Sequence, residues 1–195
     1  IYRAGIGCEL EDIEATWANA ISHPVDPVEV SIAPCQDIIW EGNDLKVEGQ
    51  SLDYIPVPIS TPGWDNAPYT TLSQYITKDP DTGIQNMGNY RGQIKGPLRI
   101  GMNPSLELRP GIYVHWEKYK KRREKMPAAV VLGAPPAVTF TSAIKLPENM
   151  DEFRVAGALA KAPINTVKAR TVDLMIPAEA EIVIEGYIDT EYLEP

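Results

Sequence analysis

The residues best suited to binding chemistry lie between Asp79 and Arg91, in the run Asp-Pro-Asp-Thr-Gly-Ile-Gln-Asn-Met-Gly-Asn-Tyr-Arg. Its opening Asp-Pro-Asp-Thr-Gly stretch consists mainly of turn formers. Asn86, Asn89, Tyr90 and Arg91 follow where the chain should re-enter a strand. An amide oxygen can ligate a hard cation, and a guanidinium can fork a carboxylate or phosphate while keeping its charge. The run therefore predicts a site for an anionic ligand.

Three further segments carry side chains that could contribute to a site. The run from Pro58 to Tyr69 is rich in Pro, Gly, Ser, Thr, Asp and Asn, which favours a surface loop of the kind that often holds binding residues. The run from Gly133 to Ile144 combines a double proline with small hydroxyl residues that let backbone approach a ring or phosphate, but a strand followed by a polyproline turn is favoured. Glu181 and Glu185 would share one face of a strand, and a solvated face is the favoured interpretation.

The elements that must position these residues are mostly short strands. Helices are predicted over about Glu9–Ser22, Gly111–Lys125 and Asp151–Ala160, the last of which opens with acidic residues as a helix N-terminus prefers. Eighteen prolines and fourteen glycines punctuate the remainder, which suits a sheet-rich α+β domain with tight corners. Strands are predicted over residues 28–32, 38–40, 69–77, 99–102, 128–132, 164–168 and 182–188.

The amino-acid composition limits the classes of function that this chain can have. A chain of 195 residues with 44% hydrophobic content can hold one well-packed domain and little more. The net charge of -9 argues against broad binding of nucleic acid or of an anionic membrane, because both need a basic face. The basic cluster 118–125 is interpreted as a solvated helix end. Cys8 and Cys35 have neither metal-ligand spacing nor a disulfide framework, so reduced cytosolic thiols are expected.

No stretch approaches the roughly 20 apolar residues of a membrane span. The opening Ile-Tyr-Arg-Ala-Gly has no methionine and no signal-peptide pattern. The sequence therefore predicts a cytoplasmic protein whose chain is cut at its beginning.

The order of these motifs resembles that of the UbiD family of prenylated-flavin-dependent decarboxylases over nearly the whole chain. The motifs that carry the resemblance are Pro34-Cys-Gln36, Pro56-Val-Pro58, the Pro-Gly-Trp-Asp-Asn-Ala-Pro-Tyr loop, Thr77–Gly83, Asn86–Arg91, Gly133–Pro136, Glu152, Ala156–Ala158, Val167-Lys168 and Asp173–Gly186. The resemblance implies a split β-barrel related to the FMN-binding domain of flavin reductases, with flanking helices. It divides the chain into an N-terminal helix and connecting segment, 1–33, and a domain that binds prenylated FMN, 34–195.

The resemblance also implies roles for individual residues. Asn86 and Glu152 resemble the ligands of a Mn²⁺ or Mg²⁺ ion at the flavin phosphate, and such ions take oxygen ligands. Arg91 resembles the arginine of the catalytic Glu-Arg-Glu network, which would bind the substrate carboxylate and set the pKa of a neighbouring acid. A companion K⁺ site and flavin contacts are implied at Met87 and at Thr141, Ser142 and Ile144. The remaining implied cofactor-binding positions are Gly88, Asn89, Tyr90, Arg91, Arg109 and Ala143.

Two departures from the family pattern affect the mechanism. The histidine that completes the metal shell in relatives should lie eighteen residues after Arg91, but that place falls in Leu108-Arg-Pro110. His115 comes later and is expected to be a core or surface residue, while Arg109 offers an alternative contact to the phosphate. The family's two catalytic glutamates should begin directly after Pro195, so the chain is expected to be truncated at both ends. Glu181 and Glu185 are assigned to the structural core and not to proton transfer.

Three functions remain open at this stage. The first is a carboxy-lyase that reversibly decarboxylates an aromatic or α,β-unsaturated acid, or a coenzyme A thioester of one, without oxidation. Its expected partners are that acid, a prenyl-flavin synthase that supplies the cofactor, and further copies of the chain or a companion chain that carries the missing glutamates. The second is a non-catalytic flavin-binding or scaffolding subunit of a multi-subunit carboxylase. The third, an ordinary flavin reductase, leaves Asn86, Arg91 and Glu152 without a role.

Overall fold

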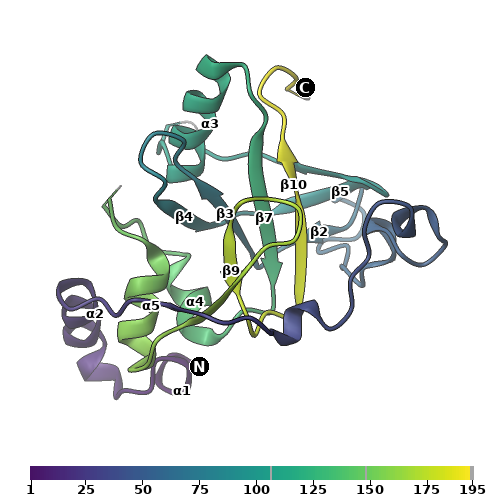
Figure 1. Cartoon of the computed structure of the whole chain (residues 1–195). Helices are drawn as coiled ribbons and strands as arrows, with labels where there is room; N and C mark the ends of the chain where they lie inside the picture. Colours follow the sequence, from purple (N-terminus) through teal and green to yellow (C-terminus); the bar gives the residue numbers. More distant parts are fainter. Residues whose placement is uncertain (106, 148, 194–195) are drawn as a thin grey trace.

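The strands of this chain form three small sheets with helices packed around them (Figure 1). The structure is a computed structural model, and it describes residues 1–105, 107–147 and 149–193. The α-helices are α1 (Tyr2–Ile6), α2 (Ile13–Ser22), α3 (Gly111–Arg122), α4 (Pro136–Thr141) and α5 (Glu152–Ala160). Short 3-10 turns cover Leu10–Asp12, Pro34–Gln36, Asp44–Lys46 and Leu52–Tyr54.

The central sheet positions the candidate site. Its strands, all antiparallel, run in the order β10 (Ile182–Ile188), β7 (Met126–Leu132), β3 (Ser73–Lys78) and β4 (Gln85–Asn89). β4 pairs on one side only, so it is an edge strand whose outward N–H groups need other partners.

The two outer sheets have three strands each. One has the order β1 (Val28–Glu29), β8 (Asn165–Lys168) and β9 (Met175–Pro177), with β1 parallel to β8. The other has the order β2 (Tyr69–Thr70), β5 (Gly92–Gly96) and β6 (Arg99–Met102). The expected α+β class with flanking helices is confirmed, and the sheets do not close into a barrel.

Each face of the central sheet is covered by different helices. On one face, Ile76, Met87 and Val131 belong to a core that includes Val138 of α4 and Phe153 of α5, and this core extends to α1 and α2. On the other face, α3 packs through a smaller core of Tyr75, Ile112, Tyr119, Met126 and Val130. Because side chains alternate along a strand, successive residues of β3 and β4 point into different cores.

Helix α5 forms because its sequence supplies both a cap and an apolar face. Asp151 precedes it, and its Oδ1 accepts a hydrogen bond of 2.8 Å from the N–H of Phe153. Phe153, Val155 and Leu159 are at most 2% exposed, and burial of side chains of this kind contributes about 1.5–3 kcal/mol each. The cap and the buried face together fix Glu152 in the first turn, next to the sheet.

Most of the predicted elements are present, with limited changes in their bounds. The early helix begins as a 3-10 turn, and the second helix ends at Arg122 because Arg123 adopts a left-handed conformation (φ 57°). The predicted strand 69–77 is divided between β2 and β3, which lie in different sheets, and strand 28–32 shortens to β1. Strands 99–102 and 182–188 are confirmed.

Two local predictions were wrong. Residues 38–40 form no strand, because no neighbouring strand pairs with them and the side chains of Ile38 and Trp40 remain exposed. The segment after the double proline is the helix α4, not a polyproline turn. Pro136 stands at its first helical position, where the fixed φ of proline suits a helix and its missing N–H is not needed.

The N-terminal segment is packed against the rest of the chain. Ile6 and Ala20 belong to the same buried cluster as Phe153, and β1 pairs with β8. The division of the chain at residue 33 stays a prediction.

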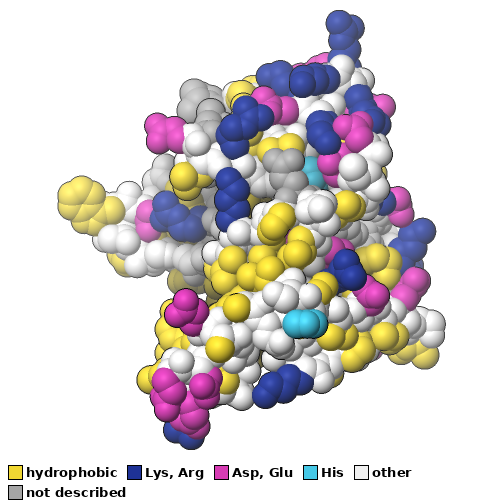
Figure 2. Space-filling model, turned by 90° about the vertical axis from the view of Figure 1, so that its left-hand side faces the viewer, with side chains coloured by type: hydrophobic (Ala, Val, Ile, Leu, Met, Phe, Trp, Pro, Cys, Tyr) yellow, Lys and Arg dark blue, Asp and Glu magenta, His cyan; other side chains and the backbone are white. Residues whose placement is uncertain are grey.

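One face of the molecule carries its charges unevenly. In Figure 2, Lys and Arg side chains gather at the top of the displayed face, while hydrophobic side chains spread across its middle. Among the described residues, no helix is long and apolar enough to cross a membrane.

Candidate cofactor site

The outer edge of β4 is covered by two groups from the α4–α5 region. The N–H of Met87 donates to Oε2 of Glu152 over 2.8 Å, and the N–H of Asn89 donates to the carbonyl oxygen of Ser142 over 3.0 Å. The first residue of α5 and the residue that follows α4 therefore satisfy backbone donors that β4 would otherwise leave unpaired. The structure thus brings together five of the predicted positions, Met87, Gly88, Asn89, Ser142 and Glu152.

Glu152 is the buried charged group of this edge. It is 5% exposed, and burial raises its pKa to about 8, against the opposing effect of the Met87 N–H bond. A buried carboxylate is costly unless a cation or hydrogen bonds compensate for the lost hydration. Its position at the strand edge makes Glu152 a candidate cation ligand.

Asn86 lies against the start of α3. Its neighbour there is Gly111, the first residue of the helix, and a Cβ atom at Gly111 would overlap the Oδ1 atom of Asn86. The Nδ2 atom of Asn86 is buried and has no hydrogen-bond partner among the described residues. A polar amide held in this way is suited to a ligand, because an unmatched buried polar group costs free energy.

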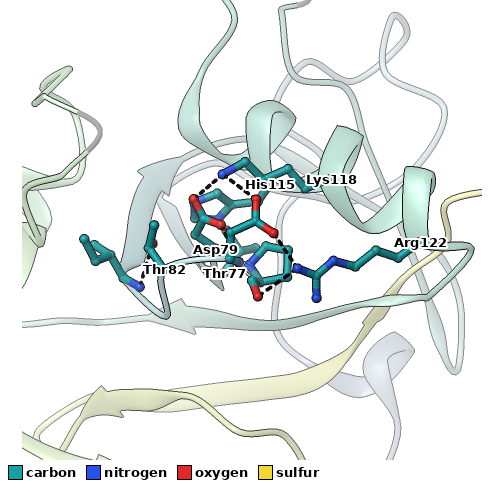
Figure 3. A network of polar contacts seen from close by, with 9 residues as sticks. Thr77, Asp79, Thr82, His115, Lys118 and Arg122 are labelled. Atoms are coloured by element: carbon teal, nitrogen blue, oxygen red, sulfur yellow. Dashed lines mark hydrogen bonds and ion pairs between the residues drawn. The ribbon is translucent and has the colours of Figure 1, made fainter.

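His115 belongs to the core under α3. It is 6% exposed, and its Nδ1 atom lies 2.9 Å from the hydroxyl oxygen of Thr77 on β3 (Figure 3). The structure therefore agrees with the interpretation of His115 as a core residue. The Nδ1 atom is engaged with Thr77.

Arg109 is held along the outer surface of α3. Its Nη2 atom lies 2.7 Å from Oε2 of Glu117, and its guanidinium carbon lies 5.7 Å from the ring centroid of Tyr113. The backbone at Arg109 has a φ of 42°, which is uncommon for a residue with a side chain. The predicted phosphate contact of Arg109 stays a prediction.

Arg91 lies in the connection between β4 and β5, and its side chain is exposed. Its guanidinium carbon lies 5.5 Å from the ring centroid of Tyr69, the residue that ends the Pro58–Tyr69 loop. The predicted surface loop and the predicted cation are thus neighbours. A guanidinium that is exposed and stacked on an aromatic ring can still bind a carboxylate.

Tyr90 packs between β4 and the smaller core that contains Tyr75. Its ring packs over Gly88, where an added Cβ would meet the Tyr90 side chain. Burial raises the pKa of Tyr90 to about 12, and the nearby charge of Glu152 contributes to the shift. Tyr90 and Glu152 are therefore close enough to interact electrostatically.

The residues predicted after the double proline have two different environments. Thr141 and Ser142 are buried, and their hydroxyls donate to the carbonyl oxygens of Ala137 and Thr139 over 2.7 Å. Ala143 and Ile144 are exposed. The hydroxyls thus close the last turn of α4, while the Ser142 carbonyl faces Asn89.

Glu185 has a structural partner. Its carboxylate accepts hydrogen bonds from the N–H groups of Arg170 and Thr171 over 2.9 and 2.6 Å, and a third from the hydroxyl of Thr171 over 2.6 Å. These contacts agree with the assignment of Glu185 to the structural core.

Sequence reasoning missed a buried amide that lies across the strands from Asn89. Gln74 is 1% exposed, and neither polar atom of its side chain has a hydrogen-bond partner within the described ranges. Its partner across the strands is Asn89, whose Oδ1 is also unpaired there. The sequence signal that could have revealed Gln74 is a glutamine inside the strand Ser-Gln-Tyr-Ile-Thr-Lys. Five of the residues of this strand are buried in the structure.

An ion network fixes the β3–β4 hairpin to α3. Lys118 lies 2.6 Å from Asp79 and 3.1 Å from Asp81, and Arg122 also pairs with Asp81. Figure 3 shows Lys118 and Arg122 extending from α3 toward the turn that carries Asp79. This hairpin–α3 network, defined by Asp79, Asp81, Lys118 and Arg122, links the strand that carries Asn86 to the helix that begins at Gly111.

Few of the described side chains at the β4 edge are candidates for binding a cation. Over residues 1–105, 107–147 and 149–193, no group of three or more His, Cys, Asp or Glu side chains could hold a metal ion. Cys8 and Cys35 are free. The oxygen-bearing side chains of Asn86 and Glu152 remain the candidates for a hard cation, and residues 194–195, next to the expected catalytic glutamates, lie outside the described ranges.

Comparisons with known proteins agree with this picture. The family model for UbiD, described as the 3-octaprenyl-4-hydroxybenzoate carboxy-lyase Rift-related domain, matches residues 27–195. An uncharacterized protein of Aquifex aeolicus is 38% identical over 127 residues, which are 65% of this chain and 26% of that protein.

Solved structures of UbiD-class enzymes superpose on almost the whole chain. HmfF from Pelotomaculum thermopropionicum, in complex with FMN, is 30% identical with a TM-score of 0.88, covering 97% of this chain and 41% of HmfF. The 3,4-dihydroxybenzoic acid decarboxylase AroY from Klebsiella pneumoniae is 28% identical with a TM-score of 0.83, covering 98% and 40%. The closed vanillic acid decarboxylase of Sedimentibacter hydroxybenzoicus is 27% identical with a TM-score of 0.83, covering 95% and 40%.

The chain thus spans between about a quarter and two fifths of the length of these relatives. The family model, in contrast, covers all of it from residue 27 onward. On this evidence, the chain belongs to the UbiD family of carboxy-lyases.

Proposed function

We propose that this chain is the flavin-binding part of a prenylated-FMN-dependent carboxy-lyase. The reaction would be the reversible, non-oxidative decarboxylation of an aromatic or α,β-unsaturated acid, or of its coenzyme A thioester. The observation that carries the proposal is the buried Glu152, hydrogen-bonded to the Met87 N–H at the edge of β4, one residue from Asn86. The likeness to HmfF, whose structures contain FMN or prenylated FMN, supports a flavin at this edge.

The donor set at this edge fits a hard cation beside a phosphate. Asn86 and Glu152 offer amide and carboxylate oxygens, which Mn²⁺ and Mg²⁺ accept. The burial of Glu152 supports the same assignment, because a cation would compensate its charge. A companion K⁺ is proposed at the Met87 backbone with Thr141, Ser142 and Ile144.

Arg91 would bind the carboxylate of the substrate. Its side chain is exposed and lies over Tyr69 beside the Pro58–Tyr69 loop, and a guanidinium can bind a carboxylate through two N–H groups. The loop would then help to bound the substrate pocket. The bound flavin would supply the electron acceptance that decarboxylation requires, while Arg91 would hold the carboxylate in place. Protonation of the product carbon is assigned to glutamates outside the 195 residues.

A scaffolding subunit is the second candidate function. The vanillic acid decarboxylase of Sedimentibacter is VdcCD, and a form with truncated VdcD has been solved. The two-component relative supports a companion chain as a partner. The evolved dimeric form of HmfF supports a second kind of partner, namely further copies of this chain. A cytoplasmic location remains part of this proposal.

Co-expression with a prenyl-flavin synthase tests the proposed function. We expect the purified protein to carry a prenylated-FMN absorption spectrum and to release CO₂ from an aromatic acid when the polypeptide that bears the catalytic glutamates is present. A flavin-loaded protein that never releases CO₂ from a broad panel of such acids would favour the scaffolding function. A folded protein that binds no flavin would contradict both.

A further inference from the structure

Arg91 lies where two segments of the chain pass from one sheet to another. The chain leaves β2 after Thr70 and enters β3 at Ser73, and it leaves β4 after Asn89 and enters β5 at Gly92. β3 and β4 belong to the central sheet, whereas β2 and β5 belong to an outer sheet, in which Thr70 is paired with Gly92. Both connections therefore cross between the same two sheets, and Arg91 belongs to one of them.

Two buried hydroxyls join these connections on either side of Arg91. The Gly92 N–H donates to Oγ1 of Thr70 over 3.0 Å, and the Ser73 hydroxyl donates to the carbonyl oxygen of Tyr90 over 2.6 Å. Thr70 and Ser73 are 3% and 0% exposed, and their hydroxyl oxygens lie 2.9 Å apart. Because the Ser73 proton is used in the bond to Tyr90, the Thr70 hydroxyl is the donor of the pair. The hydrogen bonds thus hold both peptide groups of Arg91 through one connected network.

The neighbours of this hydroxyl pair restrict Arg91 further. Successive side chains of a strand point to opposite faces, and the ring of Tyr69, the residue before Thr70, lies 5.5 Å from the guanidinium carbon of Arg91. A Cβ atom added at Gly92 would lie 2.8 Å from Oγ1 of Thr70 and would overlap Oη of Tyr75. The backbone after Arg91 is therefore packed directly against the hydroxyl that holds it.

We propose that the hydroxyls of Thr70 and Ser73 are positioning groups for Arg91. The inference rests on the proposed function, in which Arg91 binds the carboxylate of the substrate. An arginine side chain has many rotamers, and ordering it against a ligand costs conformational entropy. Fixing both peptide groups of Arg91 sets the direction of its Cα–Cβ bond, so less freedom is lost when the substrate binds and the carboxylate is held in a defined orientation. Thr70 and Ser73 are buried and act through Arg91.

The first test measures whether the hydroxyl holds the backbone beside Arg91. Thr70→Val removes the hydroxyl and keeps the shape of the side chain. The control Thr166→Val removes a hydroxyl from a threonine of β8, in the other outer sheet, that is 2% exposed. We expect hydrogen exchange of the Gly92 amide, followed by NMR, to become about tenfold faster in Thr70→Val, because its acceptor is lost, and to keep the native rate in the control. An unchanged rate in Thr70→Val would overturn the inference.

The second test measures kcat/KM for decarboxylation by the complete enzyme. We expect Thr70→Val to lower kcat/KM by about 10-fold to 100-fold without changing the flavin content, and Thr70→Ser, which keeps the hydroxyl, to retain most of the activity. Because Thr70 acts through Arg91, adding Thr70→Val to Arg91→Ala should lower kcat/KM no further. A second drop of the same size in that double variant would show that the hydroxyl acts independently of Arg91, which contradicts the inference.

A second variant and the Arg91 variant separate this inference from the proposed function. Ser73→Ala releases the Tyr90 carbonyl while the Thr70 hydroxyl stays, and it replaces Thr70→Val in the kinetic test if that protein does not fold. An inactive Arg91→Ala enzyme together with normal kcat/KM in Thr70→Val and Ser73→Ala would overturn the positioning role alone. Normal kcat/KM in Arg91→Ala would overturn the proposed role of Arg91 together with this inference.

Discussion

At the scale of single residues, the account depends on which polar groups are buried and which are exposed. Glu152 and Asn86 are held against the sheet by neighbours that leave them little freedom, namely the Met87 N–H and Gly111. Arg91 differs, because its guanidinium is exposed and rests on Tyr69. The first two residues are suited to hold a fixed group, and Arg91 is suited to bind an incoming carboxylate.

The variant Arg91→Ala tests whether Arg91 binds the substrate while other residues hold the cofactor. We expect kcat/KM for decarboxylation by the complete enzyme to fall by at least about a hundredfold, because the carboxylate is no longer positioned. The flavin content should not change, since the residues proposed to hold the phosphate are intact. Arg170→Ala, which removes an exposed arginine from the turn before β9, is the control and should keep full activity. An Arg91→Ala enzyme with normal kcat/KM would contradict the assignment.

His115 yields a stability prediction. His115→Leu leaves the buried Thr77 hydroxyl without its partner at 2.9 Å, which should lower the free energy of unfolding by about 1–3 kcal/mol. Thr77→Val combined with His115→Leu should cost less than the sum of the two single changes, because the pair is then removed together. Urea denaturation measures all three variants, and FMN-dependent Mn²⁺ binding should persist in each. Loss of that binding in His115→Leu alone would point to His115 as a metal ligand.

The sequence predicted part of this residue-scale arrangement. The resemblance located Asn86, Arg91 and Glu152, although it could not show that Glu152 satisfies an edge strand. The pairing of His115 with Thr77 was not predictable, because the two residues lie on different elements and meet only after α3 packs on β3. Gln74 was overlooked because the sequence on either side of it has the pattern of an ordinary strand.

At the scale of elements, the site depends on how α3, α4 and α5 meet the edge of β4. The family resemblance implied cofactor contacts at Thr141, Ser142 and Ile144, although the double proline before them was interpreted as a polyproline turn. Proline is also favoured in the first turn of a helix. Only the packing of Val138 into the core distinguishes the helix from the polyproline turn. The prediction of a strand at 38–40 was wrong because no element covers the apolar side chains of this segment.

The hairpin–α3 network predicts a pH dependence of stability. Burial alone would raise the pKa of Asp79, but its hydrogen bonds to Lys118 and to the Asp81 N–H outweigh burial and lower it. A lowered folded-state pKa means that the stabilisation is complete above the unfolded pKa, about 3.9, and is lost as the pH falls through that value toward the folded pKa. Because Lys118 is partly exposed, the effect should be below about 1 kcal/mol.

Asp79→Asn measures that contribution, because asparagine keeps the turn chemistry and removes the charge. We expect the variant to be less stable than the native protein at pH 6 in urea denaturation, with a gap that narrows between pH 5 and pH 3. A gap that stays constant over this range would show that the charge of Asp79 does not stabilise the fold.

At the scale of the whole molecule, three sheets share one chain and the site lies at the edge of the central one. Figure 1 shows α3 on the opposite side of the central sheet region from the N-terminal helices, and the two buried clusters follow that division. The α+β class followed from the alternation of short strands with a few helices. The distribution of strands among three sheets did not, because strand partners are set by contacts between distant segments.

Ligand binding should stabilise the whole molecule if the flavin and the cation bind the folded state together. At a free FMN concentration of 100 times the dissociation constant, with Mn²⁺ present, we expect about 2.7 kcal/mol of added stability. Thermal unfolding with FMN and Mn²⁺, with FMN and a chelator, and with riboflavin and Mn²⁺ measures it. Only the first mixture should raise Tm substantially; an equal rise with riboflavin would contradict a phosphate-linked site.

The central claim is that the edge of β4 holds the flavin phosphate through a cation bound by Asn86 and Glu152. The most direct measurement is the flavin and manganese content of the native protein and of Glu152→Gln, both purified after co-expression with a prenyl-flavin synthase. Glutamine keeps an acceptor for the Met87 N–H and removes the buried charge, so the fold should survive. The account predicts that the native protein retains flavin and manganese and that the variant loses both. A folded Glu152→Gln protein that retains both would contradict it.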